Sequence, residues 1–209
     1  PFSSSHKKEN SPIDFYQMGM KFVSYLADLK KSVFQGKEQV SLIEDLLKKQ
    51  HNVVLFANHQ VEADPQVIDY VLQDSGFDLG KEMFFVAGMR VLDDPIAAPF
   101  SRGRNLLCIH SKTYIETPPE RKREKQQHNH KTMRVMKELL SEGGKCIYVA
   151  PSGGRDRRDE SGVVQVSSFD PQSLEMFYLM GRSASNPTHF FPLALNTYEI
   201  FPPPSGIQT

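Results

Sequence analysis

The stretch Asn52-Val53-Val54-Leu55-Phe56-Ala57-Asn58-His59-Gln60-Val61-Glu62-Ala63-Asp64-Pro65 decides how this chain folds. Its first half, Val53 to Ala57, is short and continuously apolar, which predicts a fully buried strand. Pro65 then opens an apolar-periodic segment, and proline is favoured in the first turn of a helix. His59 is therefore expected in a loop at the end of a strand. In open α/β sheets this edge is where ligands bind.

The His59 loop carries a pair of residues suited to general-base chemistry. Histidine can take and return a proton near neutral pH, and a neighbouring carboxylate fixes its tautomer. Asp64 is the candidate orienter, because the spacing H-x4-D brings the two side chains together if the chain turns between them. A strand-to-helix transition allows that turn. Alone, such a pair could equally be ordinary surface chemistry, so a second feature has to support it.

A second polar loop follows another apolar run. Cys146 to Val149 predicts a strand, and it is followed directly by Ala150-Pro151-Ser152-Gly153-Gly154-Arg155-Asp156-Arg157-Arg158. Glycines let the backbone approach a ligand closely, and arginines present rigid forks that match a phosphate. A solvated turn is the alternative for this loop alone. Together with the His59 loop, it favours a phosphate-bearing substrate with a hydroxyl to deprotonate.

Four blocks of the chain stand in the order found in one enzyme family. They are Asn58 to Pro65, Phe100-Ser101-Arg102-Gly103-Arg104-Asn105, Ala150 to Arg157, and Phe191-Pro192-Leu193-Ala194-Leu195 continuing to the proline run Pro202-Pro203-Pro204. From about Asn52 onward the chain thus resembles the glycerolipid acyltransferases, in particular the soluble plastid-type glycerol-3-phosphate 1-O-acyltransferases and their bacterial relatives. The resemblance implies transfer of a fatty acyl group from an acyl carrier thioester to the sn-1 hydroxyl of glycerol 3-phosphate, giving lysophosphatidate.

The resemblance also implies roles for individual residues. His59 would be the general base and Asp64 its orienter, and positioned proton transfer of this kind contributes roughly 10²–10⁴-fold. No covalent enzyme intermediate is required. Arg155 and Arg157 would bind the substrate phosphate. Supporting positions within the matched blocks are Asn58, Glu62, Arg102, Arg104, Ser152, Gly153 and Gly154.

The chain departs from the family pattern at one place. Relatives carry a Lys-His pair after Ser-Lys, whereas this chain has Ser111-Lys112-Thr113-Tyr114. Hydroxyls thus replace two cationic contacts. Lys112, Thr113 and Tyr114 are still candidates for the phosphate site, because hydroxyls donate hydrogen bonds to phosphate and Lys112 could turn inward.

Composition agrees with a soluble globular enzyme. The 209 residues carry no formal net charge, so nothing in the bulk electrostatics points to nucleic acid. The longest apolar runs fall far short of the roughly 20 residues needed to cross a bilayer, and Pro1 begins no signal-peptide pattern. We expect a location in the bacterial cytoplasm or the plastid stroma. Cys108 and Cys146 lie in apolar runs and are expected to be reduced and buried.

The expected partners are glycerol 3-phosphate and an acyl donor, either acyl carrier protein or acyl-coenzyme A, with no cofactor and no metal. His128 and His130 could chelate a metal, but no carboxylate or cysteine ligand accompanies them. The basic run 121–125, with Lys131 beyond it, is expected to be a solvated helix face. Its functional alternative is a dock for an acidic carrier protein or for anionic headgroups in peripheral contact with a membrane.

Along the chain, residues 1–50 are expected to form a loose polar tail and two N-terminal helices, near Asp14–Phe34 and Gln39–Lys49. Residues 51–209 would form the catalytic acyltransferase domain, which could be truncated at its C-terminal end. Strands are predicted near Val53–Ala57, Met83–Val86, Leu106–Ile109, Lys145–Val149 and His189–Leu195, with helices near Pro65–Gln73, Pro118–Ser141 and Gln172–Gly181. This alternation predicts a glycerolipid acyltransferase-like α/β fold with a mixed, mostly parallel sheet flanked by helices.

Three alternative functions remain open at the level of sequence. The acceptor could be lysophosphatidate or dihydroxyacetone phosphate, because the H-x4-D block is shared by those transferases. A serine hydrolase built on Ser152 is weaker, because the glycine that a nucleophile elbow carries two residues before its serine is absent here. The third alternative is a non-catalytic module that binds phosphate or lipid headgroups.

Overall fold

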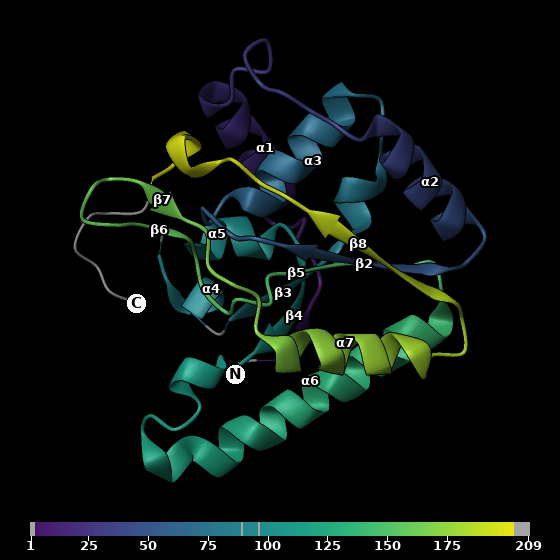
Figure 1. Ribbon diagram of the computed structural model, residues 1–209, viewed down its shortest axis with the longest axis vertical. Coiled ribbons are helices and arrows are strands. Elements are labelled where there is room, and N and C mark those ends of the chain that lie inside the picture. Colours follow the sequence, from purple (N-terminus) through teal and green to yellow (C-terminus); the bar gives the residue numbers. More distant parts are fainter. Residues whose placement is uncertain (1–2, 89, 96, 203–209) are drawn as a thin grey trace.

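The strand β2 (Asn52–Ala57) lies inside a six-stranded sheet, in which the strands described here follow the order β1–β4–β3–β5–β2–β8 (Figure 1). The other members are β1 (Ser5–His6), β3 (Phe84–Gly88), β4 (Asn105–Ile109), β5 (Cys146–Val149) and β8 (Thr188–Leu193). Every neighbouring pair is parallel except β1 with β4, so the predicted mixed, mostly parallel sheet is confirmed. The computed structural model describes residues 3–88, 90–95 and 97–202.

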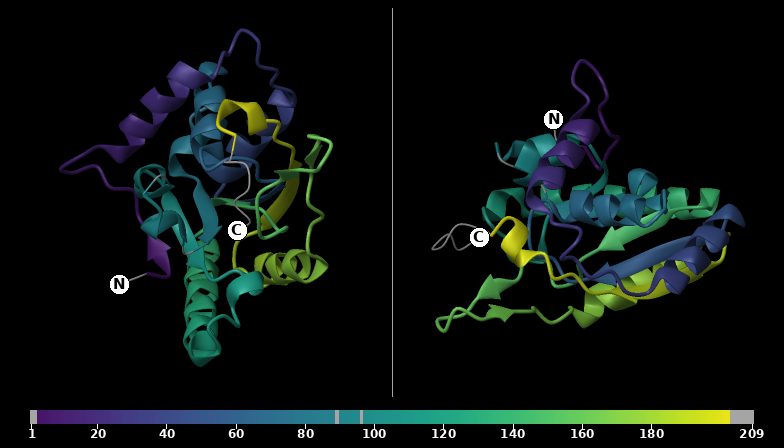
Figure 2. Two further views of the ribbon diagram at one scale, coloured as in Figure 1. Left: turned by 90° about the vertical axis from the view of Figure 1, so that its left-hand side faces the viewer. Right: turned by 90° about the horizontal axis from the view of Figure 1, so that it is seen from above.

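Helices cover both faces of this sheet (Figures 1 and 2). The α-helices are α1 (Phe15–Leu26), α2 (Lys37–Lys48), α3 (Asp64–Asp74), α4 (Arg90–Asp93), α5 (Ala97–Arg102), α6 (Lys122–Glu142) and α7 (Pro171–Arg182). Short 3₁₀ segments are η1 (Leu79–Glu82), η2 (Lys112–Tyr114), η3 (Pro119–Arg121) and η4 (Tyr198–Ile200). Parallel neighbours need crossover connections, and a sheet buried on both faces follows from helices that cross on either side.

The alternation of side chains along β2 explains the two layers. Val53, Leu55 and Ala57 point to one face, where they pack with Ile43 of α2 and Ile68 of α3. Val54, which lies between Val53 and Leu55, points to the opposite face, where it packs in a cluster with residues of α6 and α7. A strand that is buried on both faces needs apolar residues at every position, which explains the continuous apolar run from Val53 to Ala57. Each such valine or leucine contributes about 1.5–3 kcal/mol by burial.

The parallel pairing of β2 and β5 sets the position of the two polar loops. Leu55 is level with Tyr148 and Phe56 with Val149, so both strands end together at one edge of the sheet. The chain leaving β2 at Ala57 and the chain leaving β5 at Val149 therefore enter the same region. The parallel pairing therefore directs the His59 loop and the arginine-containing loop to the same side of the sheet.

Two predictions for the N-terminal residues are wrong. The tail was expected to be loose, but Ser5 and His6 form an antiparallel edge strand opposite Leu107 and Leu106 of β4. Local sequence gives no signal for a polar two-residue strand, because it forms only against an existing edge. The first helix was expected to reach Phe34 but ends at Leu26, where the carboxylate of Asp28 accepts a hydrogen bond from the Lys30 amide and starts a turn.

A small hairpin was also missed. β6 (Arg157–Arg158) and β7 (Val164–Gln165) pair antiparallel in a separate two-stranded sheet that extends away from the main sheet (Figures 1 and 2). Its loop is closed by Asp159, whose carboxylate accepts hydrogen bonds from the amides of Ser161 and Val163. The sequence there is short, charged and Gly-containing, and two-residue strands lack a recognisable period.

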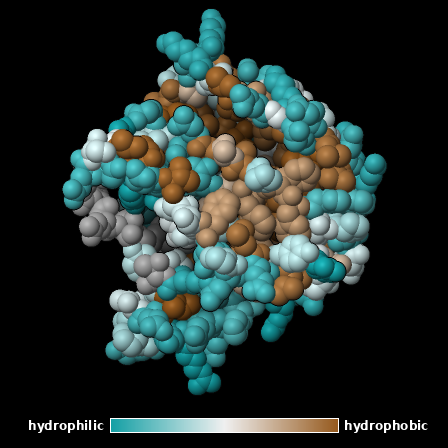
Figure 3. All heavy atoms as spheres, viewed as in Figure 1, coloured by the Kyte–Doolittle hydropathy of each residue, from teal (hydrophilic) through white to brown (hydrophobic). Residues whose placement is uncertain are grey.

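The edge strand β8 carries an apolar surface. Figure 3 shows apolar side chains gathered over this strand, between the helices of the two layers. Pro192 is exposed on it. Proline has no amide hydrogen to offer, and it is found in sheets mainly at edges. No helix within the described residues is both long enough and apolar enough to traverse a bilayer.

Both cysteines are free and buried, as predicted. Burial raises the pKa of Cys108 to about 11 and that of Cys146 to about 12. The thiolate is the reactive form of cysteine, and at these raised pKa values both thiols keep their protons. Both side chains therefore behave as small apolar residues of the core.

Candidate active site

His59 and Asp64 form a hydrogen-bonded pair at the carboxyl edge of the sheet. His59 Nδ1 lies 2.8 Å from Asp64 Oδ2. Asp64 is the first residue of α3 and is fully buried, whereas the His59 side chain is 25% exposed. The turn expected between them is present, because the Asp64 amide donates to the Val61 carbonyl oxygen at 3.1 Å. A carboxylate at Nδ1 holds the proton there and leaves Nε2 as the basic nitrogen.

Backbone amides complete the surroundings of the same carboxylate oxygen. The amides of Gln60 and Val61 donate to Asp64 Oδ2 at 2.7 and 3.2 Å. Hydrogen bonds of this kind stabilise the ionised carboxylate, because they are made to its charge. The strand-to-helix turn thus supplies its own donors, and the loop that carries His59 wraps around the residue that orients it.

Asn58 fixes the start of this loop. Its side-chain amide donates to the Leu195 carbonyl oxygen (2.9 Å) and accepts from the Leu195 amide (2.7 Å), which continues the β2–β8 pairing past the strand end. The Tyr148 hydroxyl donates to the Asn58 carbonyl oxygen at 2.8 Å. Burial, then the nearby carboxylates of Asp64 and Asp156, hold the pKa of Tyr148 well above its usual range, so this hydroxyl stays a donor.

Asp156 joins the His59 loop to the arginine-containing loop. Its amide donates to the His59 carbonyl oxygen at 2.7 Å. Its carboxylate is fully buried and accepts from the side-chain amides of Asn58 (3.0 Å) and Gln60 (3.2 Å) through one oxygen. The other oxygen accepts from the Ser167 amide at 3.0 Å. The backbone hydrogen bond from the Asp156 amide to His59 holds the segment from Arg155 to Arg157 next to the His59 loop.

The two arginines differ in their surroundings. Arg155 makes an ion pair with Glu62 of the His59 loop, with the Nη1–Oε1 distance 3.1 Å. The pKa of Arg157 is lowered by burial first and then by the positive charge of Arg155, while Tyr198, Glu62 and Tyr114 act in the opposite direction. The two guanidinium groups are therefore close enough to repel each other, and a dianionic phosphate between them would relieve that repulsion.

Lys112, Thr113 and Tyr114, where the chain departs from the family pattern, form the η2 segment. Lys112 donates to Asp170 Oδ2 at 2.5 Å and to Gln172 Oε1 at 3.2 Å, so its ammonium group lies at the N-terminus of α7. Tyr114 is 43% exposed and lies close enough to Arg157 to influence the pKa of that guanidinium. The side chain of Thr113 lies outside the described part of the structure, as do Pro203 and Pro204.

Residues of the Phe100–Asn105 block make packing contacts with α1 and α3. Arg104 is buried and donates to Asp69 Oδ2 at 2.5 Å, beneath α1 and α3. Arg102 stacks its guanidinium on the ring of Phe15, 5.5 Å from the ring centre. Between them, a Cβ at Gly103 would lie 2.7 Å from the Phe15 backbone, so only glycine fits under α1. Arg104 also donates to the Gly80 carbonyl oxygen of η1 at 3.3 Å, and its guanidinium lies 6.0 Å from the centre of the Phe85 ring in β3.

The remaining predicted positions shape the second loop. Ser152 donates its hydroxyl to the Gly154 carbonyl oxygen at 3.1 Å. Gly153 has φ of 74°, a left-handed backbone that closes the turn. Gly153 and Gly154 have open space where a side chain would begin. His128, considered above for a metal, lies with Nε2 3.0 Å from the Cys108 carbonyl oxygen, while His130 is exposed.

Four residues of the network were not predicted as site residues, and Asp156 is one of them. Tyr148 reads as part of an apolar strand, Gln60 as a spacer in H-x4-D, and Thr197 lies far along the chain. The Gln60 side chain accepts from the amides of Thr197 (2.7 Å) and Tyr198 (3.0 Å), and the Thr197 hydroxyl donates to Asp64. A polar residue inside the matched blocks was the available signal for Gln60. No local signal existed for Thr197.

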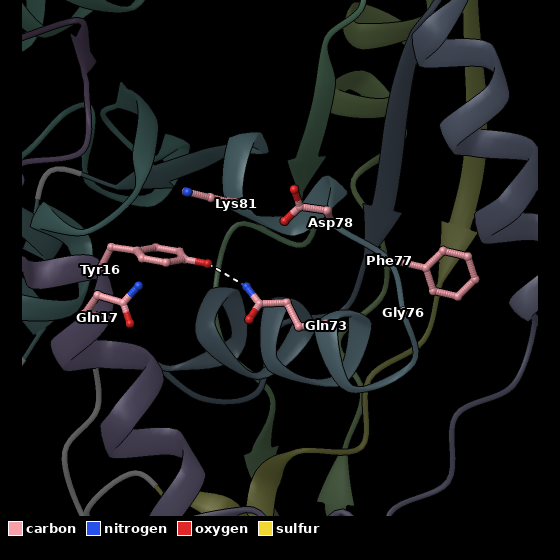
Figure 4. Close-up of a pocket in the computed structure, with 7 residues that line it drawn as sticks. All are labelled: Tyr16, Gln17, Gln73, Gly76, Phe77, Asp78 and Lys81. Atoms are coloured by element: carbon pink, nitrogen blue, oxygen red, sulfur yellow. Dashed lines mark hydrogen bonds between the residues drawn. The ribbon is translucent and has the colours of Figure 1, made fainter.

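A separate cavity of about 400 Å³ lies at the other end of α3 (Figure 4). Its lining residues are Tyr16, Gln17, Gln73, Gly76, Phe77, Asp78 and Lys81. Gln73 Nε2 donates to the Tyr16 hydroxyl oxygen at 2.6 Å across its wall. Asp64 begins α3 and Gln73 stands near its end, so this cavity is not part of the His59 site.

Comparison with known proteins places these features in a family context. The sequence model of the family described as Acyltransferase matches residues 33–196. A chloroplastic glycerol-3-phosphate acyltransferase of Cucurbita moschata is 40% identical over 208 residues, which is 99% of this chain and 45% of that protein. Chloroplastic enzymes of the same name from Arabidopsis thaliana and Spinacia oleracea are each 36% identical over 208 residues, with 45% and 44% of their lengths covered. The chain thus spans about half the length of the curated relatives it matches.

Proposed function

The chain belongs to the acyltransferase family, and from this membership we propose that it transfers a fatty acyl group from an acyl carrier thioester to the sn-1 hydroxyl of glycerol 3-phosphate. The relatives that match nearly its whole length carry the name glycerol-3-phosphate acyltransferase. His59 acts as general base, Asp64 orients it, and Arg155 and Arg157 bind the phosphate of the acceptor.

The chemical step needs no group beyond the His59–Asp64 pair for its proton transfers. His59 Nε2 takes the proton of the acceptor hydroxyl while the oxygen attacks the thioester carbonyl carbon. The C–S bond then breaks, and the departing sulfur takes the proton back from the imidazolium. Asp64, 2.8 Å from Nδ1, stabilises the positive charge that the ring carries between these transfers.

The phosphate site determines where the hydroxyl lies. Arg155 and Arg157 offer charge-assisted hydrogen bonds, and Tyr114, which lies near Arg157, contributes a hydroxyl donor to the same site. Glu62 holds Arg155 at 3.1 Å and so keeps the guanidinium beside the His59 loop. An anchored phosphate converts attack by the hydroxyl into an effectively intramolecular step.

One observation carries the proposal: the hydrogen bond of 2.7 Å from the Asp156 amide to the His59 carbonyl oxygen. This hydrogen bond brings His59, the proposed general base, next to Asp156, which has an arginine on each side in sequence. A three-carbon phosphate with its hydroxyl at one end suits a site of that construction. The acyl donor would be acyl carrier protein or acyl-coenzyme A, and the chloroplastic relatives point to the plastid stroma as the place of action.

A transfer assay with His59→Ala tests the proposal. Labelled acyl groups are offered from both carriers to glycerol 3-phosphate, lysophosphatidate and dihydroxyacetone phosphate. We expect transfer to glycerol 3-phosphate, and a fall in kcat of at least about 100-fold in His59→Ala, because the proton acceptor is lost. Binding of glycerol 3-phosphate, measured by calorimetry, should be nearly unchanged. His130→Ala, which alters an exposed histidine of α6, is the matched control and should keep full turnover.

The same experiment separates the alternatives. Turnover that survives in His59→Ala would remove the general-base assignment. A protein that binds glycerol 3-phosphate but never transfers an acyl group would be a binding module. Faster transfer to lysophosphatidate or dihydroxyacetone phosphate would keep the chemistry and replace the acceptor.

A further inference from the structure

The second carboxylate oxygen of Asp64 has a partner from a distant part of the chain. Oδ2 faces His59 and the two backbone amides of the loop, whereas Oδ1 accepts a hydrogen bond from the Thr197 hydroxyl at 2.5 Å. Thr197 is 6% exposed and Asp64 is 0% exposed, so water does not readily replace this donor. The hydroxyl is thus the partner that the structure gives to the oxygen turned away from the imidazole.

The backbone of Thr197 is held independently of its side chain. Its amide and that of Tyr198 both donate to Gln60 Oε1, at 2.7 and 3.0 Å. Two residues earlier, the backbone of Leu195 exchanges two hydrogen bonds with the Asn58 side chain. The Ile200 amide donates to the Thr197 carbonyl oxygen at 2.9 Å, which closes the first turn of η4. The chain at this point is therefore fixed to the His59 loop, and the hydroxyl is presented to Asp64 in one geometry.

We propose that Thr197 is a positioning residue for general-base catalysis, acting through Asp64 on His59; this role rests on the proposed acyl transfer. The hydroxyl holds the plane of the carboxylate, and the carboxylate in turn holds the plane of the imidazole. It also stabilises the ionised form of the carboxylate, because a threonine hydroxyl donates one hydrogen bond and does so to a negative oxygen. A neutral imidazole and an ionised carboxylate are the pair that the general-base step needs.

Tyr148, Asp156 and Glu62 are ionisable groups near the His59–Asp64 pair, and each is held by contacts of its own. Tyr148 of β5 interacts electrostatically with Asp64 and with Asp156. The Asp156 amide donates a hydrogen bond to the His59 carbonyl oxygen, and Glu62 forms an ion pair with Arg155. Tyr148 keeps its proton, because its pKa is raised by burial. A change at Thr197 therefore acts on the His59–Asp64 pair without a compensating shift of charge from these neighbours.

Two substitutions separate the hydroxyl from the shape of the side chain. Thr197→Val keeps the volume and removes the donor, while Thr197→Ser keeps the donor. We expect Thr197→Val to lower kcat about 10-fold, because an uncompensated buried acceptor disturbs the pair, with little change in KM for glycerol 3-phosphate. The acidic limb of the pH profile of kcat/KM should move to higher pH, because the less well stabilised carboxylate lets the pair bind a proton more readily. Thr197→Ser should lie within about threefold of the parent in kcat.

The matched control is Thr132→Val. Thr132 is fully buried, and its hydroxyl donates to the Cys108 carbonyl oxygen at 2.7 Å, away from the His59 loop. It should reduce stability without moving the pH profile. A purely structural role for Thr197 would give the same pattern, so an unmoved acidic limb in Thr197→Val overturns the proposal. So does an equal loss of kcat in Thr197→Ser and Thr197→Val, since the hydroxyl would then be irrelevant. If Thr197→Val does not fold, Thr197→Ala takes its place.

A measurement without turnover keeps this proposal distinct from the proposed function. The His59 Nδ1 proton, followed by NMR with ¹⁵N-labelled histidine, resonates downfield while it is held between the ring and the carboxylate. In Thr197→Val it should move upfield and exchange faster with water, and in Thr197→Ser it should not. If the parent transfers no acyl group to any acceptor, the proposed function fails, and the proton signal alone decides whether Thr197 holds the pair. An unchanged signal in Thr197→Val would overturn the positioning role.

Discussion

Asp156 shows how one side chain can set the relation between two loops at the edge of a sheet. Its carboxylate accepts hydrogen bonds from the side-chain amides of Asn58 and Gln60 and from the Ser167 backbone, and it has no exposed surface. Every partner in this arrangement is a donor, so the site requires an acceptor at both oxygens. Only aspartate, with two acceptor oxygens on a short side chain, meets that requirement here.

Asp156→Asn should therefore destabilise the protein despite its similar shape. In either orientation its amide group would face a donor, leaving buried polar groups unpaired, and we expect the free energy of unfolding to fall by about 2 kcal/mol or more. Urea denaturation measures this. Asp74→Asn, at an exposed position of α3, is the control and should change stability by no more than about 0.5 kcal/mol. Equal effects from the two substitutions would mean that the donors around Asp156 find other partners.

At the scale of elements, the η2 segment and α7 are tied together by one ion pair. Asp170 is the N-cap of α7 and accepts from the Ser173 amide at 2.9 Å, while Lys112 of η2 donates to the same carboxylate. The hydrogen bond from Lys112, and then that from Ser173, lowers the pKa of Asp170 to about 2. This tether holds the segment that contains Tyr114 against the helix beside it.

Lys112→Met should raise the pKa of Asp170 from about 2 toward its ordinary value of 3.8, because the cation that stabilises the carboxylate is gone. Titration of the Asp170 carboxyl carbon by NMR measures the change. Since the folded-state pKa lies below the unfolded value, the tether stabilises the fold above about pH 4 and is lost as the pH falls toward 2. A pKa that stays near 2 in Lys112→Met would assign the shift to the helix cap instead.

At the level of the whole molecule, a buried ion pair links α3 to the start of β4, and its arginine also packs against α1. Arg104, 1% exposed, donates to Asp69 of α3 and contacts the sulfur of Met20 in α1 at 3.2 Å, with its guanidinium 5.0 Å from the centre of the Tyr16 ring. Burial lowers the pKa of Arg104, and the carboxylate of Asp69 opposes that shift. Among the residues that the structure describes, Asp69 is the acidic partner that balances this charge in the interior.

Removing that partner should destabilise the whole fold. In Asp69→Ala the guanidinium of Arg104 stays buried without a counter-charge, and we expect a loss of about 3–5 kcal/mol in the free energy of unfolding. Urea denaturation followed by circular dichroism measures it, and Asp74→Ala on the same helix serves as the control. A second variant, Asp69→Leu with Arg104→Met, should recover much of the loss, since an apolar pair needs no charge balance. Failure of Asp69→Ala to exceed its control would show that Arg104 reaches water.

Much of the fold follows from local patterns in the sequence. The apolar runs of β2 and β5, the strand-to-helix transition at Pro65 and the alternation of strands with helices each depend on neighbours in sequence, and the structure agrees with them. The pairing of His59 with Asp64 belongs to this group, because five residues and one turn bring the two side chains together. The local predictions failed for the edge strand at Ser5–His6 and for the β6–β7 hairpin, which exist only through their partners, and for the C-terminal end of α1.

Local sequence patterns were enough to select His59, Asp64, Arg155 and Arg157 as candidate site residues and to predict the strands that precede their loops. The long-range contacts appear only in the folded chain: Asp156 accepts from Asn58 and Gln60, Arg104 pairs with Asp69, and Thr197 donates to the far oxygen of Asp64. The physical reason is the separation of the partners along the chain. A strand or a turn is specified by interactions within a few residues, whereas a buried carboxylate takes its donors from whichever segments the finished fold packs around it.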